Sequence, residues 1–245
     1  MVWSGIMLLV VHACISLIAF RLIFKKPLPQ DQEYHNFADQ VKKCCCVPNF
    51  NDVFSNVPFL VVGIAGVLHV PFLQFHNPYE LLGWLMFFSS IILVSFGSAY
   101  YHWTPNDETL IWDRLPMTLA FMTLYGILLE ERVTHALFLI VPFQCIGLWS
   151  VCYWRRHHDL RPYAAVQFYW IFSLPWLFWL FQERYTHQYY IWYSVAMYAL
   201  AKLCEMADHR IYRWTRCCVS GHTLKHLSSC GAICCVLVML VSRHT

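Results

Sequence analysis

The sequence is poor in charge. Asp, Glu, Lys and Arg make up only 13% of its 245 residues, whereas a soluble domain carries about 25%. Hydrophobic residues account for 59% and aromatic residues for 18%. A water-soluble protein of this composition would need one very large core and no long apolar runs. The chain contains many such runs, so we expect an integral membrane protein.

Other features are also missing. The formal net charge is only +3, and no stripe of Lys and Arg marks a nucleic-acid partner. The 12 cysteines include no CxxC pair, so a zinc ribbon is not indicated. Cys44 to Cys46 and the pair Cys217 and Cys218 are expected to be reduced thiols in loops at a membrane surface, where a host with the enzymes can thioacylate them.

No alternating pattern typical of barrel strands is present, so segments that cross the bilayer are expected to be helices. Eight runs are near the roughly 20 residues that a crossing helix needs. Trp and Tyr gather at many of their ends, as in interfacial belts. The connections are mostly short, which predicts one all-α, polytopic bundle. The expected spans are Trp3–Phe24, Val53–Phe75, Leu81–His102, Leu110–Leu129, Ala136–Trp154, Tyr163–Phe181, Tyr190–Glu205 and Leu224–Val241.

The first span can be interpreted as a signal peptide or as a retained anchor. Its start lacks Lys and Arg, and "FRLIFKK" follows where a small-residue cleavage site should stand. We therefore expect an N-terminal transmembrane anchor and linker over residues 1–30, followed by the main domain over residues 31–245. The longest connection is Lys25–Asp52, in which "QEYHNFADQVKK" is expected to form a short surface helix.

Lys and Arg are distributed unevenly between the two ends of the expected spans. The end that holds the N-terminus has Arg132, Arg184 and Arg243. The other end has ten basic residues, Lys25, Lys26, Lys42, Lys43, Arg155, Arg156, Arg161, Arg210, Arg213 and Arg216. Short cytoplasmic loops are enriched in Lys and Arg, so this second end is predicted to face the cytoplasm.

Ionisable residues gather at the same predicted cytoplasmic end. His102 closes the third expected span, Asp113 lies just inside the fourth, and His222 and His226 open the last. Ionisable residues at membrane depth are candidates for function. Ser98 and His102 are four residues apart and share a helical face, as do His222 and His226. Each residue alone also has a structural interpretation, such as an interfacial histidine or a serine bonded to the backbone.

Taken together, these residues predict a metal-dependent hydrolytic site. Three neutral imidazoles are a good ligand set for Zn²⁺ and leave a position for water, whose pKa the metal lowers toward neutrality. Asp113 can accept a proton from that water or orient it. Ser98 can donate a hydrogen bond to the developing oxyanion. The alternative for Asp113 is an ion pair with Arg114.

For the neighbouring charged residues we expect supporting roles rather than roles in the reaction. We expect Glu205 to form ion pairs with nearby basic residues such as Lys202, and Lys225 to extend to the lipid headgroups. Asp208 is expected either to pair with a basic residue or to orient a ligand histidine. "HHDLRPY" at His157–Tyr163 is a basic interfacial loop suited to lipid phosphates.

The order of these motifs resembles the alkaline ceramidase family, which shares a superfamily with adiponectin and progestin receptors and the GPI-remodelling Per1 proteins. The motifs are "SAYYH", "WDRLPMT" and "SGHTLKH", and "NFNDVFSNVPFLVVG" resembles the segment that opens the first core helix. The resemblance covers about Asp31 to the end. It implies a seven-helix core behind one extra N-terminal transmembrane helix.

The resemblance also implies an activity. Zinc would be held by His102, His222 and His226, with Asp113 activating water and Ser98 stabilising the oxyanion. A ceramide-like lipid would be cleaved to a sphingoid base and a fatty acid. Alternatives within the superfamily are a receptor-like lipid-binding protein with structural zinc and a lipid ester hydrolase of the GPI-remodelling type.

Two features depart from the ceramidase pattern. Ceramidases also bind Ca²⁺ before the first core helix; the candidates here are Asp31, Glu33, Asn36, Asn49 and Asp52, and Asn49 stands where the family has a glutamate. Alkaline ceramidases place the metal toward the lumen, whereas the charge bias of this chain places the site toward the cytoplasm.

Overall fold

The computed structural model describes residues 7, 10, 13–14, 16–18, 21, 25–40, 46–133 and 139–244. Over these residues the fold is all-helical, and no strand occurs among them. The elements are η1 (Gln32–His35), α2 (Phe50–Phe54), α3 (Val57–His69), η2 (Val70–Phe72), α4 (Pro78–Trp103), α5 (Asp107–Glu130), α6 (Ile140–His157), α7 (Arg161–Leu180), α8 (Tyr190–Met206), α9 (Asp208–Trp214) and α10 (Gly221–Ser242).

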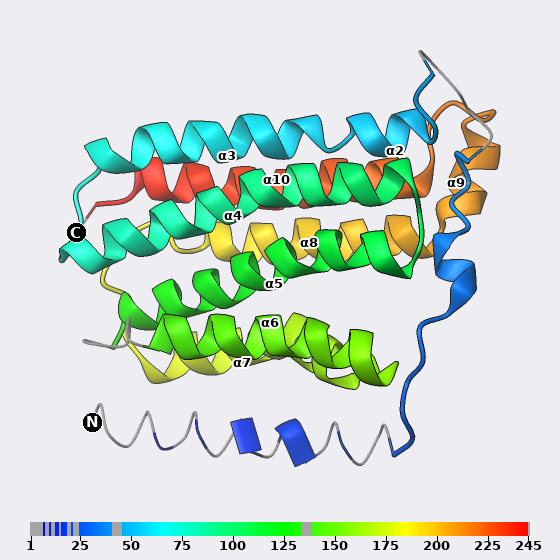
Figure 1. Ribbon diagram of the computed structural model, residues 1–245. Helices are drawn as coiled ribbons and strands as arrows, with labels where there is room; N and C mark the ends of the chain where they lie inside the picture. Colours follow the sequence, from blue (N-terminus) through cyan, green and yellow to red (C-terminus); the bar gives the residue numbers. More distant parts are fainter. Residues whose placement is uncertain are drawn as a thin grey trace.

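The long helices run side by side in one bundle, with α9 and η1 at one end and the C-terminus at the other (Figure 1). Helix α4 packs against α3 and α5, and α10 packs against α8 and α3. The core between them is aromatic and aliphatic, with fully buried Trp84, Phe88, Ile127 and Val236. Burial of such side chains stabilises the packing by about 1.5–3 kcal/mol for each residue relative to full exposure in water.

Helices occur over each of the expected spans from Val53 onward. Three described helical stretches are long and apolar enough to cross a membrane, namely Phe50–Phe72, Pro78–Trp103 and Gly221–Ser242, which indicates a membrane protein. The first of these is interrupted rather than continuous, since α2 ends before Pro58 opens α3. Most of the expected anchor Trp3–Phe24 lies outside the described residues, so the N-terminal anchor stays a prediction.

Side-chain caps fix where α5 and α10 begin at the α9 end of the bundle, called the polar end below. The Asn106 side chain accepts from the amides of Glu108 and Thr109 at the start of α5, and Ser220 accepts from the Thr223 amide at the start of α10. Such caps stabilise a helix start by about 1 kcal/mol. The tight turn between α4 and α5 therefore brings the last turn of α4 beside the first turns of α5.

Two glycines allow helices to approach closely near this end. A Cβ on Gly97 of α4 would lie 2.0 Å from the Trp112 carbonyl oxygen of α5. A Cβ on Gly221 of α10 would lie 2.3 Å from the Cys204 carbonyl oxygen of α8. Only glycine fits at these two contacts, so α4 can pack closely against α5, and α10 against α8.

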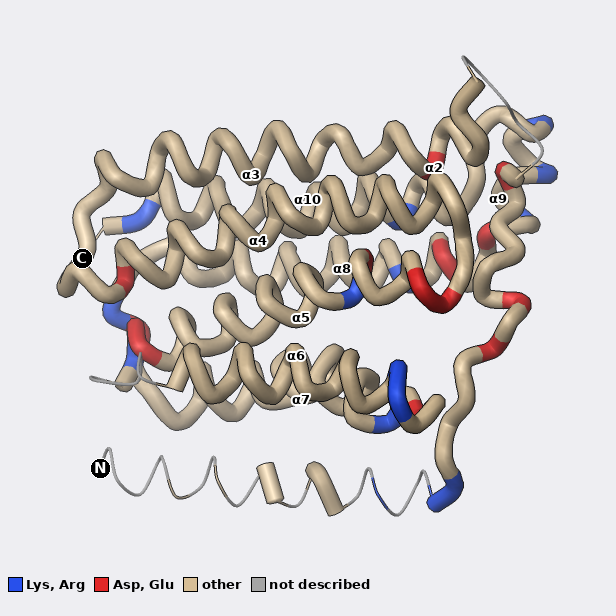
Figure 2. Tube along the Cα trace, viewed as in Figure 1, with Lys and Arg blue, Asp and Glu red and all other residues tan. Residues whose placement is uncertain are grey.

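Charged residues gather at the two ends of the bundle (Figure 2). At the end away from α9, Arg184 donates to Glu80 (3.1 Å), Arg243 pairs with buried Glu131, and Arg132 donates to the Leu128 carbonyl (3.1 Å). At the α9 end the basic side chains are mostly exposed, among them Lys25, Lys26, Arg155, Arg156, Arg210, Arg213 and Arg216. The described structure thus separates the basic residues by end as the sequence suggests, with Lys42 and Lys43 outside the described residues.

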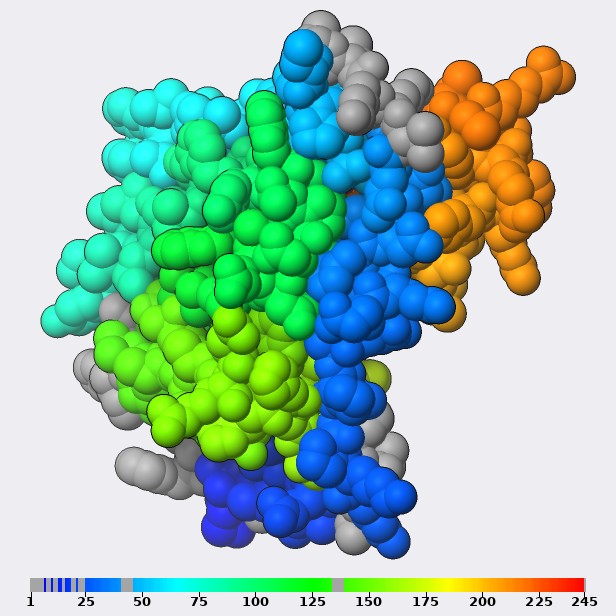
Figure 3. Space-filling view, turned by 45° about the vertical axis from the view of Figure 1, so that its right-hand side comes forward, coloured from blue at the N-terminus to red at the C-terminus, as the bar shows by residue number. Residues whose placement is uncertain are grey.

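Residues 25–40, called the N-terminal strap below, cross the polar end of the bundle and lie against α4, α5 and α9 (Figure 3). The Leu28 amide donates to Asp159 (3.1 Å), and Arg114 donates to Gln30 (2.7 Å). The expected surface helix is only the single turn η1 within the described part, because the following residues turn inward. Hydrogen bonds from Arg161 hold the pKa of the Asp159 carboxyl below its usual value, so this anchor point is anionic at neutral pH.

Candidate metal centre

Three histidines from two helices meet beneath the N-terminal strap. His102 lies in the last turn of α4, and His222 and His226 occupy the first turns of α10. Each offers a ring nitrogen, and these atoms all lie within 4.8 Å of one another. The ring centroids of His102 lie 4.7 Å from His222 and 4.8 Å from His226. All three side chains are buried, which is an expensive place for imidazoles that bind nothing.

The hydrogen bonds of His226 leave one nitrogen free to bind a metal. Ser55 donates its hydroxyl hydrogen to the Asp52 carbonyl (3.1 Å), so at its 2.7 Å contact with His226 Nδ1 it acts as acceptor. This network assigns the imidazole hydrogen to Nδ1 and leaves a lone pair on Nε2. Nε2 of His226 is buried without a hydrogen-bond partner, and the same holds for both ring nitrogens of His102.

His222 is held differently, through Lys225. The Lys225 Nζ lies 3.1 Å from His222 Nε2 and 2.9 Å from Glu205 Oε1. The expected extension of Lys225 to the headgroups is therefore wrong: its side chain is only 13% exposed and turns inward because the Glu205 carboxylate attracts it. The expected pairing of Glu205 with Lys202 is confirmed at 2.8 Å.

Asp113 and Ser98 lie on the α5 and α4 sides of the site. Both are buried, and Ser98 is placed to hydrogen-bond the Asp113 carboxylate, which also lies in the field of Lys225. Ser98 can donate its hydroxyl hydrogen to that carboxylate, and its role at the oxyanion stays a prediction. Arg114, the alternative partner of Asp113, instead donates to Gln30 and stacks over Trp154, with its guanidinium carbon 4.1 Å from the ring centroid.

Backbone contacts fix the first turn of α10. Asp208 accepts from the His222 amide (2.8 Å) and from the Ala38 amide of the strap (3.0 Å). It therefore positions a ligand histidine through the main chain rather than through the imidazole. Asp52 accepts from the hydroxyls of Ser220 (2.9 Å) and Thr223 (2.7 Å), which ties α2 to the same turn.

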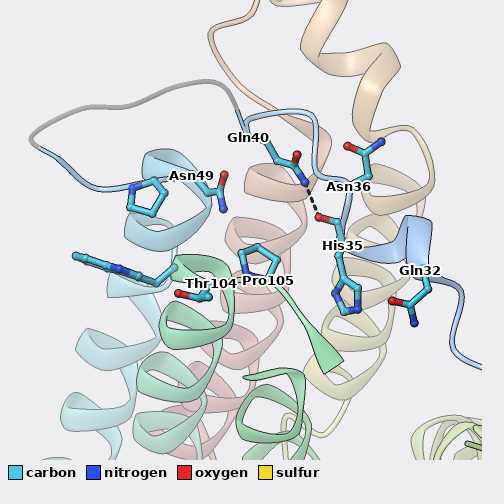
Figure 4. Close-up of a pocket in the computed structure, with 9 residues that line it drawn as sticks. Gln32, His35, Asn36, Gln40, Asn49, Thr104 and Pro105 are labelled. Atoms are coloured by element: carbon cyan, nitrogen blue, oxygen red, sulfur yellow. Dashed lines mark hydrogen bonds between the residues drawn. The ribbon is translucent and has the colours of Figure 1, made fainter. Parts of the chain in front are cut away.

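An aromatic ring of the strap covers the site from the end of the bundle. The Phe37 ring centroid lies 4.6 Å from that of His102 and 4.4 Å from that of His222. Beside it, a polar pocket of about 560 Å³ is lined by strap residues and the α4–α5 turn, including His35, Asn36, Asn49 and Thr104 (Figure 4). Asn49 connects this pocket to the centre, because its amide donates to the His102 carbonyl (2.7 Å).

The candidate calcium ligands have other partners in part: Asp31 accepts from the Glu33 amide within η1, and Asn49 and Asp52 are engaged as described above. Among the described His, Cys, Asp and Glu residues, the histidine trio is the one group of three that could hold a metal ion, so the Ca²⁺ site stays a prediction. Asp39 lies near Asp52 and accepts from Tyr212 (3.4 Å). Burial, with the nearby Asp39 charge, raises the pKa of Tyr212, which therefore stays a donor.

No family model, curated protein or solved structure matches this chain. The chemistry of the centre thus rests on its donors. Three buried imidazoles, two of which have ring nitrogens without a hydrogen-bond partner, fit a borderline transition-metal ion such as Zn²⁺, Co²⁺ or Ni²⁺, for which imidazole is a common ligand. His102, His222 and His226 would hold such an ion, as the sequence predicts.

Three contributors to the site were not predicted. Ser55 lies 171 residues from His226, and Phe37 lies in the segment that was expected to form a surface helix. The inward turn of Lys225 depends on Glu205 from another helix. Spacing along one helix reveals ligand pairs, but none of these contacts follows from spacing.

Proposed function

We propose that the chain is a multi-pass membrane hydrolase that uses a zinc ion on His102, His222 and His226 to cleave the N-acyl amide of a ceramide-like lipid. The observation that carries the proposal is the buried histidine trio with free ring nitrogens next to a buried carboxylate. The order of motifs that resembles alkaline ceramidases supports the substrate class. A seven-helix core with one additional N-terminal helix is part of the same proposal.

The residues divide the reaction R–CO–NH–R′ + H₂O → R–COOH + H₂N–R′ between them. A bound zinc ion lowers the pKa of water toward neutrality. Asp113 accepts the proton of the attacking water and delivers it to the amide nitrogen as the C–N bond breaks. Ser98 holds the Asp113 carboxylate in place. Phe37 and the strap exclude bulk water, which strengthens electrostatic interactions inside the site.

The location of the site is proposed on charge. Exposed basic residues gather at the α9 end, where the histidines lie, and the end with more Lys and Arg faces the cytoplasm in most membrane proteins. An epitope inserted after Arg216 should then be reached by antibody only after the plasma membrane or vesicle is permeabilised. Labelling from the outside of intact cells would contradict this orientation.

The test of function starts from detergent-purified protein and a panel of labelled ceramides. The wild type should carry about one zinc ion per chain and release a fatty acid and a sphingoid base. His222→Ala should lose zinc and activity together, whereas His69→Ala, an exposed histidine at the other end of the bundle, should retain both. Stoichiometric zinc in His222→Ala would refute the ligand assignment.

Asp113→Asn separates chemistry from metal binding. The variant keeps the shape of the side chain, so zinc content should be unchanged, while loss of the proton acceptor should lower turnover by about 10²–10⁴-fold. Unchanged turnover would remove Asp113 from the reaction. Release of products from an ester lipid alone would favour the ester hydrolase, and zinc-loaded protein without either activity would favour a receptor-like protein with structural zinc.

A further inference from the structure

Lys225 places a partly buried ammonium group beside the candidate metal centre. It lies three residues after His222 on α10, and its Nζ contacts both Glu205 Oε1 (2.9 Å) and His222 Nε2 (3.1 Å). Glu205 also accepts from Lys202 (2.8 Å) and from Tyr34 (3.4 Å). One carboxylate thus faces two ammonium groups, and the Asp113 carboxylate also lies in the field of Lys225.

The contact between Lys225 and His222 cannot persist when a metal ion is bound. An ammonium group only donates, so the contact needs a lone pair on His222 Nε2. A neutral imidazole has a single ring lone pair and one N–H. If the ion takes that lone pair at Nε2, Lys225 loses its acceptor; if the ion binds Nδ1 instead, Nε2 carries the hydrogen and cannot accept. In both cases one N–H of Lys225 is released beside the ligands while Glu205 still holds the ammonium.

Among the described residues, the two serine hydroxyls beside the histidine trio are directed at other acceptors. The single hydroxyl hydrogen of Ser98 is directed at Asp113, and Ser55 donates to the Asp52 carbonyl. We infer that Lys225 binds the acyl oxygen of the lipid at the metal centre, both in the polarised amide and in the carboxylate product. This inference rests on the proposed function. A charge-assisted hydrogen bond to a developing anion is the strong kind in a buried site.

The network supplies a matched control. In Lys225→Met, Glu205 keeps Lys202 and Tyr34, so its carboxylate is not left without a partner. In Lys202→Met, Glu205 keeps Lys225 and Tyr34, and the group that contacts His222 remains. The two variants remove the same charge from the same carboxylate, and only one of them removes the donor at the metal centre.

The experiment measures carboxylate binding rather than turnover. The full chain in detergent is loaded with Co²⁺, whose visible spectrum reports a change in its ligands, and titrated with laurate. Lys225→Met should bind laurate about 10–100-fold more weakly than wild type, the loss expected for a hydrogen bond between charged groups. Lys202→Met should stay within about threefold of wild type, because it leaves that bond in place.

Zinc affinity gives an independent readout. Lys225→Met should bind Zn²⁺ at least as tightly as wild type, because the ammonium no longer competes for the His222 lone pair. Equal laurate affinity in wild type and Lys225→Met, or zinc binding weakened more than about tenfold in that variant, would overturn the inference. If the Met variant does not fold, Lys225→Gln replaces it, with laurate affinity reduced since the charge is lost; unchanged affinity would again overturn the role.

The outcome separates this inference from the proposed function. Protein that binds metal and laurate through Lys225 but cleaves no amide refutes the amidohydrolase and leaves the Lys225 role standing. Protein that cleaves ceramide while Lys225→Met binds laurate normally refutes only the role of Lys225.

Discussion

Ser55 determines which nitrogen of His226 can bind a metal. Its hydroxyl donates to the Asp52 carbonyl and accepts from His226 Nδ1, so the imidazole is oriented with Nε2 toward the other two histidines. Partners of this kind around a ligand histidine fix its tautomer and ring orientation. Asp208 accepts from the backbone amide of His222. Each of the two histidines of α10 is thus held by a residue outside that helix.

We expect Ser55→Ala to weaken Zn²⁺ binding by about 10–100-fold, because His226 can then rotate and change its tautomer. Competition with a chromogenic chelator measures this affinity in detergent. Ser90→Ala is the matched control, since Ser90 donates only to the Met86 carbonyl within its own helix. An affinity of Ser55→Ala equal to that of the control would show that the hydroxyl does not orient the ligand.

At the scale of helices, the centre depends on how closely α4 approaches α5. His102 and Ser98 come from α4 and Asp113 from α5, and the two helices touch at Gly97, where the Trp112 carbonyl leaves no room for a Cβ. The spacing of the helices is therefore set one residue before Ser98. A change at Gly97 is expected to alter the distance between His102, in the last turn of α4, and the Asp113 carboxylate on α5.

Gly97→Ala should lower the free energy of unfolding by about 1–3 kcal/mol, the usual cost of overpacking. It should lower turnover more than zinc content, because Asp113 on α5 moves away from the site while the three histidines lie on α4 and α10. Thermal unfolding in detergent and zinc analysis measure the two effects. Gly231→Ala is the control: its Cβ would meet only the flexible end of Met197. Equal behaviour of both variants would mean that the α4–α5 contact does not position the site.

The positions of most helices were predictable from the sequence, for a physical reason. Apolar runs long enough for a bilayer must form helices, so α4, α5, α7, α8 and α10 occur close to their expected bounds. Helical spacing also pairs His222 with His226. The break between α2 and α3, the path of the strap and the inward turn of Lys225 were not predictable, because each depends on contacts between segments distant in sequence.

Across the whole molecule, polar networks close the two ends of the bundle. The end with the metal centre is closed by the strap, and the opposite end by Arg243, Glu131, Glu80 and Arg184. Glu131 pairs with Arg243 and also accepts from the Trp84 indole (3.1 Å). Both residues of this ion pair are buried, so each depends on the other for its neutralisation.

Arg243→Met should lower the free energy of unfolding by about 3–5 kcal/mol, since it leaves the buried Glu131 charge without its partner. Arg155→Met removes an exposed pair with Glu108 and should cost no more than about 1 kcal/mol. Unfolding followed by circular dichroism in detergent compares them. Zinc content should be unchanged in both folded variants; loss of zinc in Arg243→Met would show that the two ends are coupled.

The donor set of the centre has a consequence for redox chemistry. All three ligands are imidazoles, and no cysteine of the described residues belongs to the group, although Cys230 lies one helical turn beyond His226. Thiolates are lost as ligands when they are oxidised to sulfenic acids or disulfides, whereas imidazole nitrogens are unaffected by such mild oxidation. Among the described residues, air and thiol-alkylating reagents thus act on side chains other than the three histidines. A metal ion bound by these histidines would be retained in an oxidising as well as in a reducing compartment.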